Sequence, residues 1–440
     1  MDKDKKGSVY FIGIGGIGIS ALARWFLAHG YKISGSDLSP SSTTKELESE
    51  EIKIFIGKHQ AENLDLKSVR VIYNQAIPQD NPELKKAQVL KIPASTYPEV
   101  IGELTKIYKT VAIAGAHGKS TTTSMIALIL EAAKFDPTVI VGTKLKEFGN
   151  KNFRSGKSDY LVLEADEWKA SFLHYFPYAA LITNVDREHL DFYKNLSEIK
   201  KTFLHFIENI HEYGLLVLNH DDKNLYSLHK LIKRKIVWYS LKSKEALVIK
   251  KILKIPGKHN LSNAVGAYTL CRALGVSKAT ILKTLSAYSG AWRRSEYRGE
   301  FMGASIFDDY GHHPTEIKAT LAGFREKYPK DNLVCVFQPH QRERLKILFK
   351  DFIKAFNLAD DLILLEVYGV AGRDDQKTEF GSQNLAKAIS LNNNKTVSVV
   401  KNLEELKKSI SNNLVSNKKN IIIMMGAGNI NEYTDELFRI

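Results

Sequence analysis

The chain has 440 residues, 44% of them hydrophobic and 10% aromatic, which is enough for about three globular domains with substantial cores. No apolar run approaches the ~18 residues that a membrane span needs, and residues 1–6 lead into a strand rather than a secretory segment. We therefore expect a cytoplasmic protein that does not bind membranes. The net charge of +14 comes from scattered lysines without an arginine-rich arm, which suits nucleotides better than nucleic acid.

The first stretch of the chain reads as a strand, a glycine-rich loop and a helix. Residues 8–14 are apolar, residues 13–18 contain four glycines, and residues 19–29 have a helical pattern. The next strand ends at Ser36 and Asp37, where a dinucleotide-binding fold places its ribose contact. This order would suit an NAD-dependent oxidoreductase, but the glycines indicate only a nucleotide diphosphate at a helix N-terminus.

A further strand and a boundary follow. The strand at residues 69–73 leads into the loop 74–78, at the strand end where open α/β sheets bind ligands. Residues 80–83 predict a capped helix start with an early proline. The stretch 92–98 contains two prolines and small polar residues, so we interpret it as a linker-like segment before the next domain.

The most informative motif lies near residue 115, where an apolar strand breaks into a small-residue loop and a hydroxyl-rich helix start. Gly115 and Gly118 would let backbone N–H groups approach phosphates, and Lys119 would supply a point charge. Ser120 or Thr121 could hold Mg²⁺ by a hydroxyl group. Because the usual G-x-x-x-x-G-K-[ST] pattern lacks its first glycine here, an ordinary glycine-containing βα turn remains an alternative.

Two later strand ends carry complementary chemistry. The buried-type strand beginning at residue 160 ends in carboxylates at 164–167, the position where a P-loop fold holds magnesium. The strand at 179–184 leads to His189, which is flanked by acids and could be a ligand or a surface ion pair. In the turn at 256–263, two asparagines could read an adenine edge or cap a helix.

The last third alternates strands and helices again. Predicted strands at 305–308, 333–338, 362–368 and 420–425 have polar residues near their carboxyl ends, which predicts a second doubly wound sheet. The fold class is thus α/β with a Rossmann-like domain at 1–106, a central P-loop-type ATPase domain at 107–290 and a C-terminal doubly wound α/β domain at 291–440. The two cysteines, Cys271 and Cys335, are predicted to be buried and reduced.

Taken in order, these motifs resemble those of the Mur ligases over essentially the whole chain. The resemblance implies a three-domain ligase that uses ATP and Mg²⁺ to join L-alanine to the carboxylate of UDP-N-acetylmuramate, through an acyl phosphate, in peptidoglycan precursor synthesis. The motifs that carry it are residues 13–18 with 36–37, 115–121, 164–167, 183–189, 256–260, 308–316 and 337–340.

The resemblance also implies roles for individual residues. The UDP-sugar would lie on Gly15, Gly16, Ile17, Gly18, Ser36, Asp37, Ala76 and Ile77. ATP would lie on Gly115, His117, Gly118, Lys119, Ser120 and Thr121, with Asn260 and Asn263 near adenine, and with Arg293, Arg294 and Asp308 closing over the nucleotide. Ser120, Glu164 and His189 would hold the metal, and Tyr310, His340 and Arg344 would surround the amino acid. Catalysis would rest on Lys119, Glu164, His189, His340 and Arg344, with His340 or His312 as the base.

Three departures from the family pattern leave alternatives open. Ser120 replaces the usual threonine but keeps its hydroxyl group, and Trp168 with Lys169 replaces a Ser-Asp pair. Gln341 stands where the pattern has an arginine, the natural clamp for an amino-acid carboxylate. Glycine or serine therefore remain possible substrates, and a sibling ligase that attaches a recycled peptide shares the same layout. A nucleic-acid-stimulated P-loop ATPase, a non-catalytic binding protein, and either a monomer or a homodimer remain possible as well.

Overall fold

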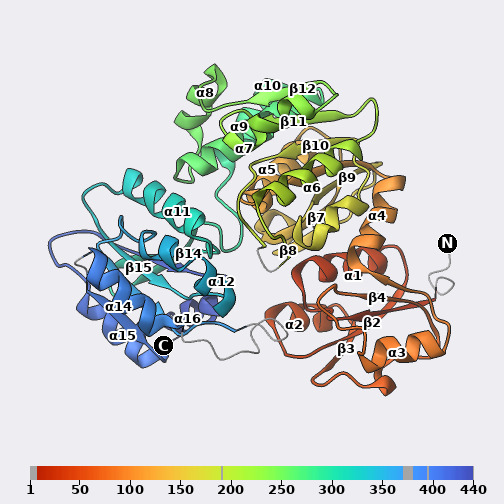
Figure 1. Ribbon diagram of the computed structural model, residues 1–440, viewed down its shortest axis with the longest axis horizontal. Coiled ribbons are helices and arrows are strands. Elements are labelled where there is room, and N and C mark those ends of the chain that lie inside the picture. The colour runs from red at the N-terminus through yellow and green to blue at the C-terminus, as the bar shows by residue number, and fades with distance from the viewer. Residues whose placement is uncertain (1–6, 190–191, 370–379, 394–395, 440) are drawn as a thin grey trace. The chain divides into compact units, whose positions relative to one another are not determined.

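The computed structural model of the chain describes residues 7–189, 192–369, 380–393 and 396–439 (Figure 1). The chain forms two compact units, one of Met1–Ser243 with Ala264–Thr284 and one of Lys244–Asn263 with Leu285–Ile440. The described residues contain three separate β-sheets, flanked by helices. The predicted α/β class is confirmed. Within the described residues no helix combines the length and the apolar character that a membrane crossing requires.

The first sheet is parallel, with strand order β3-β2-β1-β4-β5. The chain builds outward from β1 in both directions, so the crevice for a ligand lies at the carboxyl ends of β1 and β4. The linker prediction for residues 92–98 was wrong, because this stretch forms an edge strand and the start of a helix. The elements are β1 (Ser8–Ile12), α1 (Ile17–Ala28), β2 (Lys32–Asp37), α2 (Ser42–Ser49), β3 (Lys53–Ile56), β4 (Ser68–Tyr73), α3 (Pro82–Val89), β5 (Ala94–Thr96) and α4 (Tyr97–Ile107).

The second sheet has strand order β12-β11-β10-β6-β9-β7-β8, and only its edge strand β8 is antiparallel to its neighbour. Because β6 lies between β9 and β10, the loop after β6 is flanked by the two strand ends that carry the predicted acids and histidine. The strands are β6 (Lys109–Ala114), β7 (Thr138–Leu145), β8 (Lys151–Arg154), β9 (Tyr160–Glu164), β10 (Ala179–Ile182), β11 (Leu215–Asn219) and β12 (Ile236–Tyr239), with helices α5 (Lys119–Ala132), α6 (Leu196–Glu208), α7 (Lys223–Leu228), α8 (Lys244–Ile252), α9 (Lys258–Ala273) and α10 (Lys278–Ala287).

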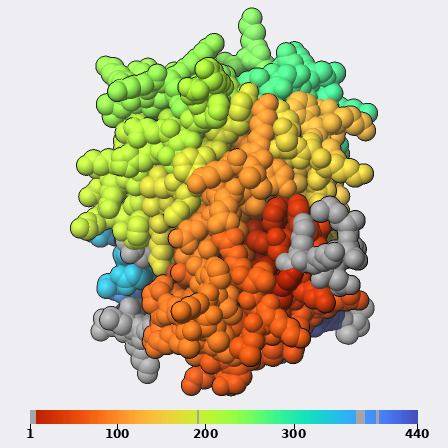
Figure 2. All heavy atoms as spheres, turned by 90° about the vertical axis from the view of Figure 1, so that its right-hand side faces the viewer, coloured from red at the N-terminus to blue at the C-terminus, as the bar shows by residue number. Residues whose placement is uncertain are grey.

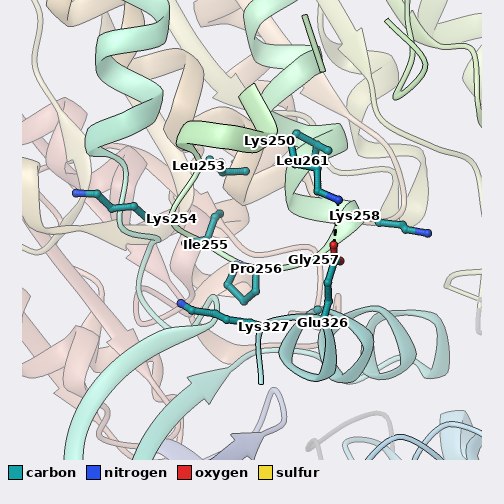
Figure 3. Close-up of a pocket in the computed structure, with 11 residues that line it drawn as sticks. Lys250, Leu253, Lys254, Ile255, Pro256, Gly257, Lys258, Leu261, Glu326 and Lys327 are labelled. Carbon is teal, nitrogen blue, oxygen red and sulfur yellow. Dashed lines mark hydrogen bonds and ion pairs between the residues drawn. The ribbon is translucent and has the colours of Figure 1, made fainter. Parts of the chain in front are cut away.

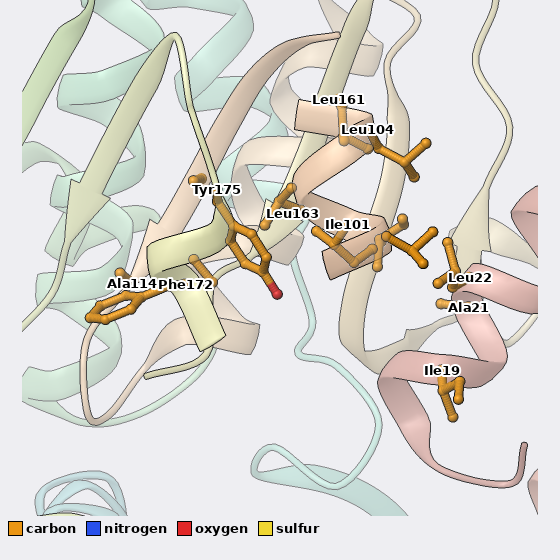
Figure 4. Packing of buried hydrophobic residues seen from close by; sticks show 14 of the residues in the cluster. Ile19, Ala21, Leu22, Ile101, Leu104, Ala114, Leu161, Leu163, Phe172 and Tyr175 are labelled. Carbon is orange, nitrogen blue, oxygen red and sulfur yellow. The ribbon is translucent and has the colours of Figure 1, made fainter. Parts of the chain in front are cut away.

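The first two sheets share one hydrophobic cluster. Leu22 of α1, Leu104 of α4 and Leu163 of β9 are buried in the same cluster, as Figure 4 shows. Only Tyr108 separates α4 from β6. In Figure 2 the residues of the first sheet and its helices, coloured red to orange, adjoin those of the second, coloured orange to green. The two regions are therefore parts of one packed body.

The third sheet has strand order β13-β14-β18-β15-β16-β17, with an antiparallel edge strand β13. The carboxyl ends of its central strands β14, β18 and β15 lie side by side, and the predicted amino-acid residues follow two of them. Cys271 and Cys335 are buried free thiols, as predicted. The strands are β13 (Glu296–Phe301), β14 (Ala304–Asp309), β15 (Asn332–Phe337), β16 (Asp361–Leu365), β17 (Val397–Val400) and β18 (Asn420–Met425), with helices α11 (Pro314–Lys327), α12 (Arg342–Ile347), α13 (Phe349–Ile353), α14 (Ser382–Asn393), α15 (Leu403–Asn412) and α16 (Ile430–Leu437).

Candidate active site

The loop between β6 and α5 has the backbone shape of a phosphate cradle. Gly118 is the N-cap of α5 in a left-handed conformation, with φ 83°. Gly115 has φ 128°, and a Cβ atom there would lie 2.1 Å from Thr183 Oγ1. Only glycine fits such a position, because an L side chain would meet both backbone strain and a collision. The helix N-terminus and its N–H groups therefore remain accessible to an anion.

The neighbouring strand β10 fixes this loop from one side. The His117 N–H donates to Asn184 Oδ1 at 2.9 Å, and the hydroxyl group of Thr183 donates to the His117 carbonyl at 2.6 Å. The His117 Nε2 atom lies 3.0 Å from Asp186 Oδ2. The imidazole ring of His117, which we predicted to contact ATP, thus pairs with an acid of the adjacent strand end.

Lys119 is a largely buried positive charge, 12% exposed, at the start of α5. Its Nζ atom donates to the Gly115 carbonyl at 2.7 Å and to Glu167 Oε2 at 2.8 Å. Burial would lower the pKa of Lys119, but the charges of Glu167, Asp166 and Glu164 outweigh burial and raise that pKa well above its usual value. The ammonium group is therefore charged at every physiological pH.

Two of the three predicted metal ligands lie together. The Ser120 hydroxyl group donates to Glu164 Oε1 at 3.1 Å, and the N–H of Gly142 on β7 donates to Glu164 Oε2 at 2.9 Å. Thr121, the alternative hydroxyl ligand, is 5% exposed in the same helical turn. A hydroxyl group next to an oriented carboxylate is the kind of oxygen pair that Mg²⁺ prefers.

The third predicted ligand, His189, faces a different pair of acids. Its Nε2 atom lies 3.6 Å from Glu167 Oε1 and 3.9 Å from Asp166 Oδ1. The three residues can offer ligand atoms that all lie within 4.8 Å of one another. Glu167 Oε1 is buried and accepts no hydrogen bond from the described residues, which fits a site for a cation. Asp166 and Glu167 were not predicted as ligands, although both lie in the acidic segment 164–167.

The glycine-rich loop after β1 offers backbone N–H groups, and no capping side chain, to a ligand. Gly16 is the N-cap of α1, and no side chain caps that helix. The N–H of Gly15 donates to Asp37 Oδ2 at 2.8 Å, so one carboxylate oxygen of Asp37 supports the loop itself. The predicted ligand residues Ile17 and Gly18 belong to the first turn of α1.

The loop after β4 lies beside these glycines. A Cβ atom on Gly16 would be 3.2 Å from Asn74 Nδ2. Asn74 orders the loop, because its side chain accepts from the Ala76 N–H and its carbonyl accepts from the Ile77 N–H, both at 2.9 Å. The structure therefore brings Ala76 and Ile77 next to the glycine-rich loop.

The side chain of Ser36 contradicts our expectation of a ligand contact. Ser36 is 1% exposed, and its hydroxyl group donates to Glu83 Oε2 at 2.6 Å and lies 3.1 Å from His59 Nδ1. Successive residues of a strand point to opposite faces, so Ser36 and Asp37 cannot both face one ligand. We correct the prediction, because the Ser36 side chain belongs to a buried polar network.

In the second unit, the predicted nucleotide contacts divide into two groups. The guanidinium groups of Arg293 and Arg294 lie 5.2 and 4.8 Å from the ring centre of Tyr310. Asp308 instead pairs with Arg298 and accepts a hydrogen bond from Thr434 at 2.6 Å. Burial raises the pKa of Asp308 to about 6. The Asp308 carboxyl group is therefore already paired with protein groups, which does not favour the predicted contact with a nucleotide.

The predicted amino-acid residues of this unit do lie together. The ring of His312 packs edge-on against Tyr310 at 5.4 Å and against His340 at 5.9 Å. Arg344 Nη1 lies 3.3 Å from His340 Nδ1. Tyr368, which sequence reasoning missed, stacks on His340 at 5.7 Å. The sequence marks Tyr368 only weakly as a site residue. We predicted it as the last residue of a strand, whereas β16 ends three residues earlier, at Leu365.

The asparagines of α9 also belong to the second unit. Asn260 and Asn263 are each 5% exposed, and the Asn260 amide donates to the Pro256 carbonyl at 2.7 Å. A pocket of about 250 Å³ lies nearby, against the Gly257 turn and the end of α11. Figure 3 shows Lys250 paired with Glu326 across it, at 3.1 Å, while its other lysines point apart. Without converging polar groups, this pocket offers no oriented ligand site.

Comparison with known proteins decides the family. The model of the Mur ligase family catalytic domain matches residues 8–109, the Mur ligase middle domain matches residues 113–254, and the Mur ligase glutamate ligase domain matches residues 293–428. The chain belongs to the Mur ligase family.

Two curated relatives of this Mur ligase that match it over nearly its full length share one name. The UDP-N-acetylmuramate–L-alanine ligase of Aquifex aeolicus is 38% identical over 100% of the chain and 99% of the relative. That of Clostridium perfringens is 38% identical over 97% of each. The crystal structure of the UDP-N-acetylmuramate–alanine ligase from Thermotoga maritima matches with a TM-score of 0.81 and 26% identity over 98% of each chain. A murein peptide ligase from Psychrobacter arcticus has the same fold, with a TM-score of 0.72 and 23% identity.

Proposed function

We propose that this Mur ligase joins L-alanine to the carboxylate of UDP-N-acetylmuramate, with cleavage of ATP to ADP and phosphate. The full-length identity to relatives named for that reaction supports the proposal. The observation that carries the phosphoryl-transfer part is Lys119, a largely buried and permanently charged ammonium group at a glycine-bounded helix N-terminus. The two glycine-rich loops of the first unit supply separate places for a UDP-sugar and for ATP.

The first chemical step activates a poor electrophile. The muramate carboxylate attacks the γ-phosphorus of ATP, ADP leaves, and an acyl phosphate forms. We assign Lys119 to the transferring phosphate, because its charge offsets the repulsion between the two anions. The N–H groups around Gly118 would hold the remaining phosphate oxygens.

Ser120 and Glu164 are the residues that we propose for Mg²⁺, with His189, Asp166 and Glu167 as a neighbouring set of ligands. When bound, the cation would neutralise phosphate charge during the transfer. The chain's own contribution is the orientation of these oxygens. The Gly142 N–H fixes one oxygen of Glu164, while the other meets the Ser120 hydroxyl group.

The second step needs a neutral amine, which attacks the acyl carbon and releases phosphate. Arg344 can only donate, so the His340 Nδ1 atom beside it accepts, and the neutral ring of His340 carries its proton on Nε2. His312 has the opposite arrangement, because its Nδ1 atom faces the Tyr310 carbonyl at 3.2 Å and therefore donates. This leaves the basic lone pair of His312 on Nε2. We therefore assign the base to His312 and the binding of the amino-acid carboxylate to Arg344.

The test is phosphate release from ATP by the purified full-length protein with UDP-N-acetylmuramate, magnesium and one amino acid at a time. We expect turnover with L-alanine to exceed that with glycine or L-serine, and no turnover without the UDP-sugar. Turnover with a tripeptide instead would identify a peptide ligase. ATP hydrolysis that depends on DNA or RNA would contradict the proposal. Four expectations stay predictions. They are the cytoplasmic location, the monomeric or dimeric state, the lack of nucleic-acid binding and the domain boundaries.

A further inference from the structure

The hairpin of β7 and β8 contacts both ligand regions of the first unit. On β7, the N–H of Gly142 donates to Glu164 Oε2. On β8, the Asn152 amide donates to the Ile17 carbonyl at 2.5 Å and to Ser20 Oγ at 2.9 Å. One short element therefore contacts the proposed magnesium carboxylate and the first turn of the helix that follows the UDP-sugar loop.

The orientation of the Asn152 amide follows from the chemistry of its partners. Arg24 on α1 can only donate, and its Nη1 atom contacts Asn152 Oδ1. The Ile17 carbonyl can only accept, so the NH₂ group of Asn152 must face it. Asn152 is 0% exposed, and an amide in this position must satisfy all its partners at once. Its rotamer and its flip state are thus fixed.

Ion pairs also stabilise the contact between the β7–β8 hairpin and α1. Arg24 Nε lies 3.1 Å from Glu50 Oε1, and Arg24 Nη2 lies 3.4 Å from Glu46 Oε2. Lys144 of β7, two residues after Gly142, also pairs with Glu46. Both acids lie at or just after α2, so the hairpin, α1 and α2 are joined by buried or half-buried polar groups. Such a network resists relative displacement of its members.

We propose that Asn152 is a positioning residue that sets the UDP-diphosphate site relative to the phosphoryl-transfer site. The inference rests on the proposed function, in which the UDP-sugar lies on the glycine-rich loop after β1; we assign its diphosphate to the N–H groups of Ile17 and Gly18 in the first turn of α1. The first N–H groups of a helix have no partner within the helix, so their direction depends on how the first turn is held. Asn152 holds that turn at the Ile17 carbonyl. Since small misplacements of reacting groups reduce rates strongly, the fixed hairpin aligns the muramate carboxylate with ATP.

The experiment compares N152A and N152D with K151A in the full-length protein. N152D keeps an acceptor for Arg24 but loses the donors to Ile17 and Ser20, so it separates positioning from loss of the ion network. Lys151 is the adjacent control on β8, because it is 45% exposed and K151A removes an ion pair with Glu50, at 3.0 Å, while it leaves the hydrogen bonds of Asn152 in place. Steady-state constants are measured below each variant's melting temperature, after the wild-type enzyme has been shown to turn over.

We expect kcat to fall in N152A and N152D, because the muramate carboxylate is misaligned with ATP, and the KM for the UDP-sugar to rise about tenfold, as loss of one or two buried hydrogen bonds implies. The KM for ATP should stay within about twofold, and K151A should resemble wild type on every constant. A merely structural role would lower the amount of active enzyme and the melting temperature but leave the KM for the UDP-sugar unchanged, which would overturn the inference. A wild-type enzyme that makes no ADP with these substrates would instead refute the proposed function.

Discussion

Two glycine-rich βα loops of the same unit, residues 13–18 and 115–118, look alike in sequence but present different chemistry. The second loop is followed by Lys119 with an acid cluster around it. The first loop is followed by Ile19 where the second is followed by a lysine, and the carboxylate of Asp37 accepts a hydrogen bond from the first loop's own backbone. A loop that only binds a diphosphate can rely on N–H groups and a helix N-terminus, whereas a loop that transfers phosphate needs a charge aimed at the reacting group.

The largest test of this contrast is Lys119→Met. We expect phosphate release to fall at least about 10³-fold, because the transferring phosphate loses its charge partner. The affinity for the UDP-sugar should remain close to wild type, since the other loop is unchanged. Phosphate-release kinetics and calorimetry with the UDP-sugar measure the two effects. Loss of sugar binding in a variant that still melts cooperatively would contradict the assignment of the UDP-sugar and of ATP to separate loops.

The second test replaces one glycine in each loop by alanine. In Gly115→Ala the new methyl group meets Thr183 Oγ1 at 2.1 Å, and φ is 128°, so we expect the free energy of unfolding to fall by about 3 kcal/mol or more. Gly16 has an ordinary φ of −63°, and its nearest contacts are 3.2 Å away. Gly16→Ala should therefore cost less than about 1 kcal/mol. It should still raise the KM for the UDP-sugar. Chemical denaturation of both variants checks the difference.

The third test concerns Glu83, the buried acid that accepts a hydrogen bond from Ser36. Burial would raise the pKa of Glu83, but hydrogen bonds with His59, Ser36 and Asn63 outweigh burial and lower it. Its stabilising effect is thus present above the unfolded pKa and is lost as pH falls through the lower folded value. We expect Glu83→Gln to reduce the free energy of unfolding by about 1–3 kcal/mol at pH 7 and to make the decline of stability at acid pH shallower. Urea denaturation from pH 3 to pH 7 measures both; an unchanged acid slope would refute the assignment.

The smallest effect is expected for Asp37→Asn. The amide oxygen can still accept from the Gly15 N–H, but without a charge, so the loop should be held less firmly. We predict an increase of about fivefold in the KM for the UDP-sugar, with kcat nearly unchanged. A larger effect on kcat than on KM would show that Asp37 acts in the chemistry and not in binding.

The central strands of each sheet could be predicted from the sequence, since apolar runs with polar ends marked β1, β2 and β4, then β6, β9 and β10, then β14, β15, β16 and β18. Other strands, the β7–β8 hairpin among them, were not predicted. Three-residue β5 was missed because a short edge strand next to prolines has the composition of a linker. Ser36 was misassigned although alternation along a strand separates its side chain from that of Asp37.

The position of Glu167 beside Lys119 could not be predicted. After Glu167 the chain passes through Lys169 and Ala170, with φ values of 50° and 56°. Neither residue type favours that left-handed region, so no local signal marks the bend. Contacts from the first domain support it, because Lys169 donates to the Gln75 carbonyl and Ser171 donates to Gln75 Oε1. Tertiary contacts thus decide the shape of this segment.

The single residue between α4 and β6 has a practical consequence for dissecting the enzyme. Tyr108 alone links α4 to β6, and Leu22 and Leu104 are buried in the same cluster as Leu163. A fragment that ends at residue 107 would therefore expose an apolar surface that is buried in the whole chain. Such a truncated piece would be expected to self-associate or bind chaperones rather than report on sugar affinity. Ligand studies of the first region should therefore use protein that extends through the second sheet.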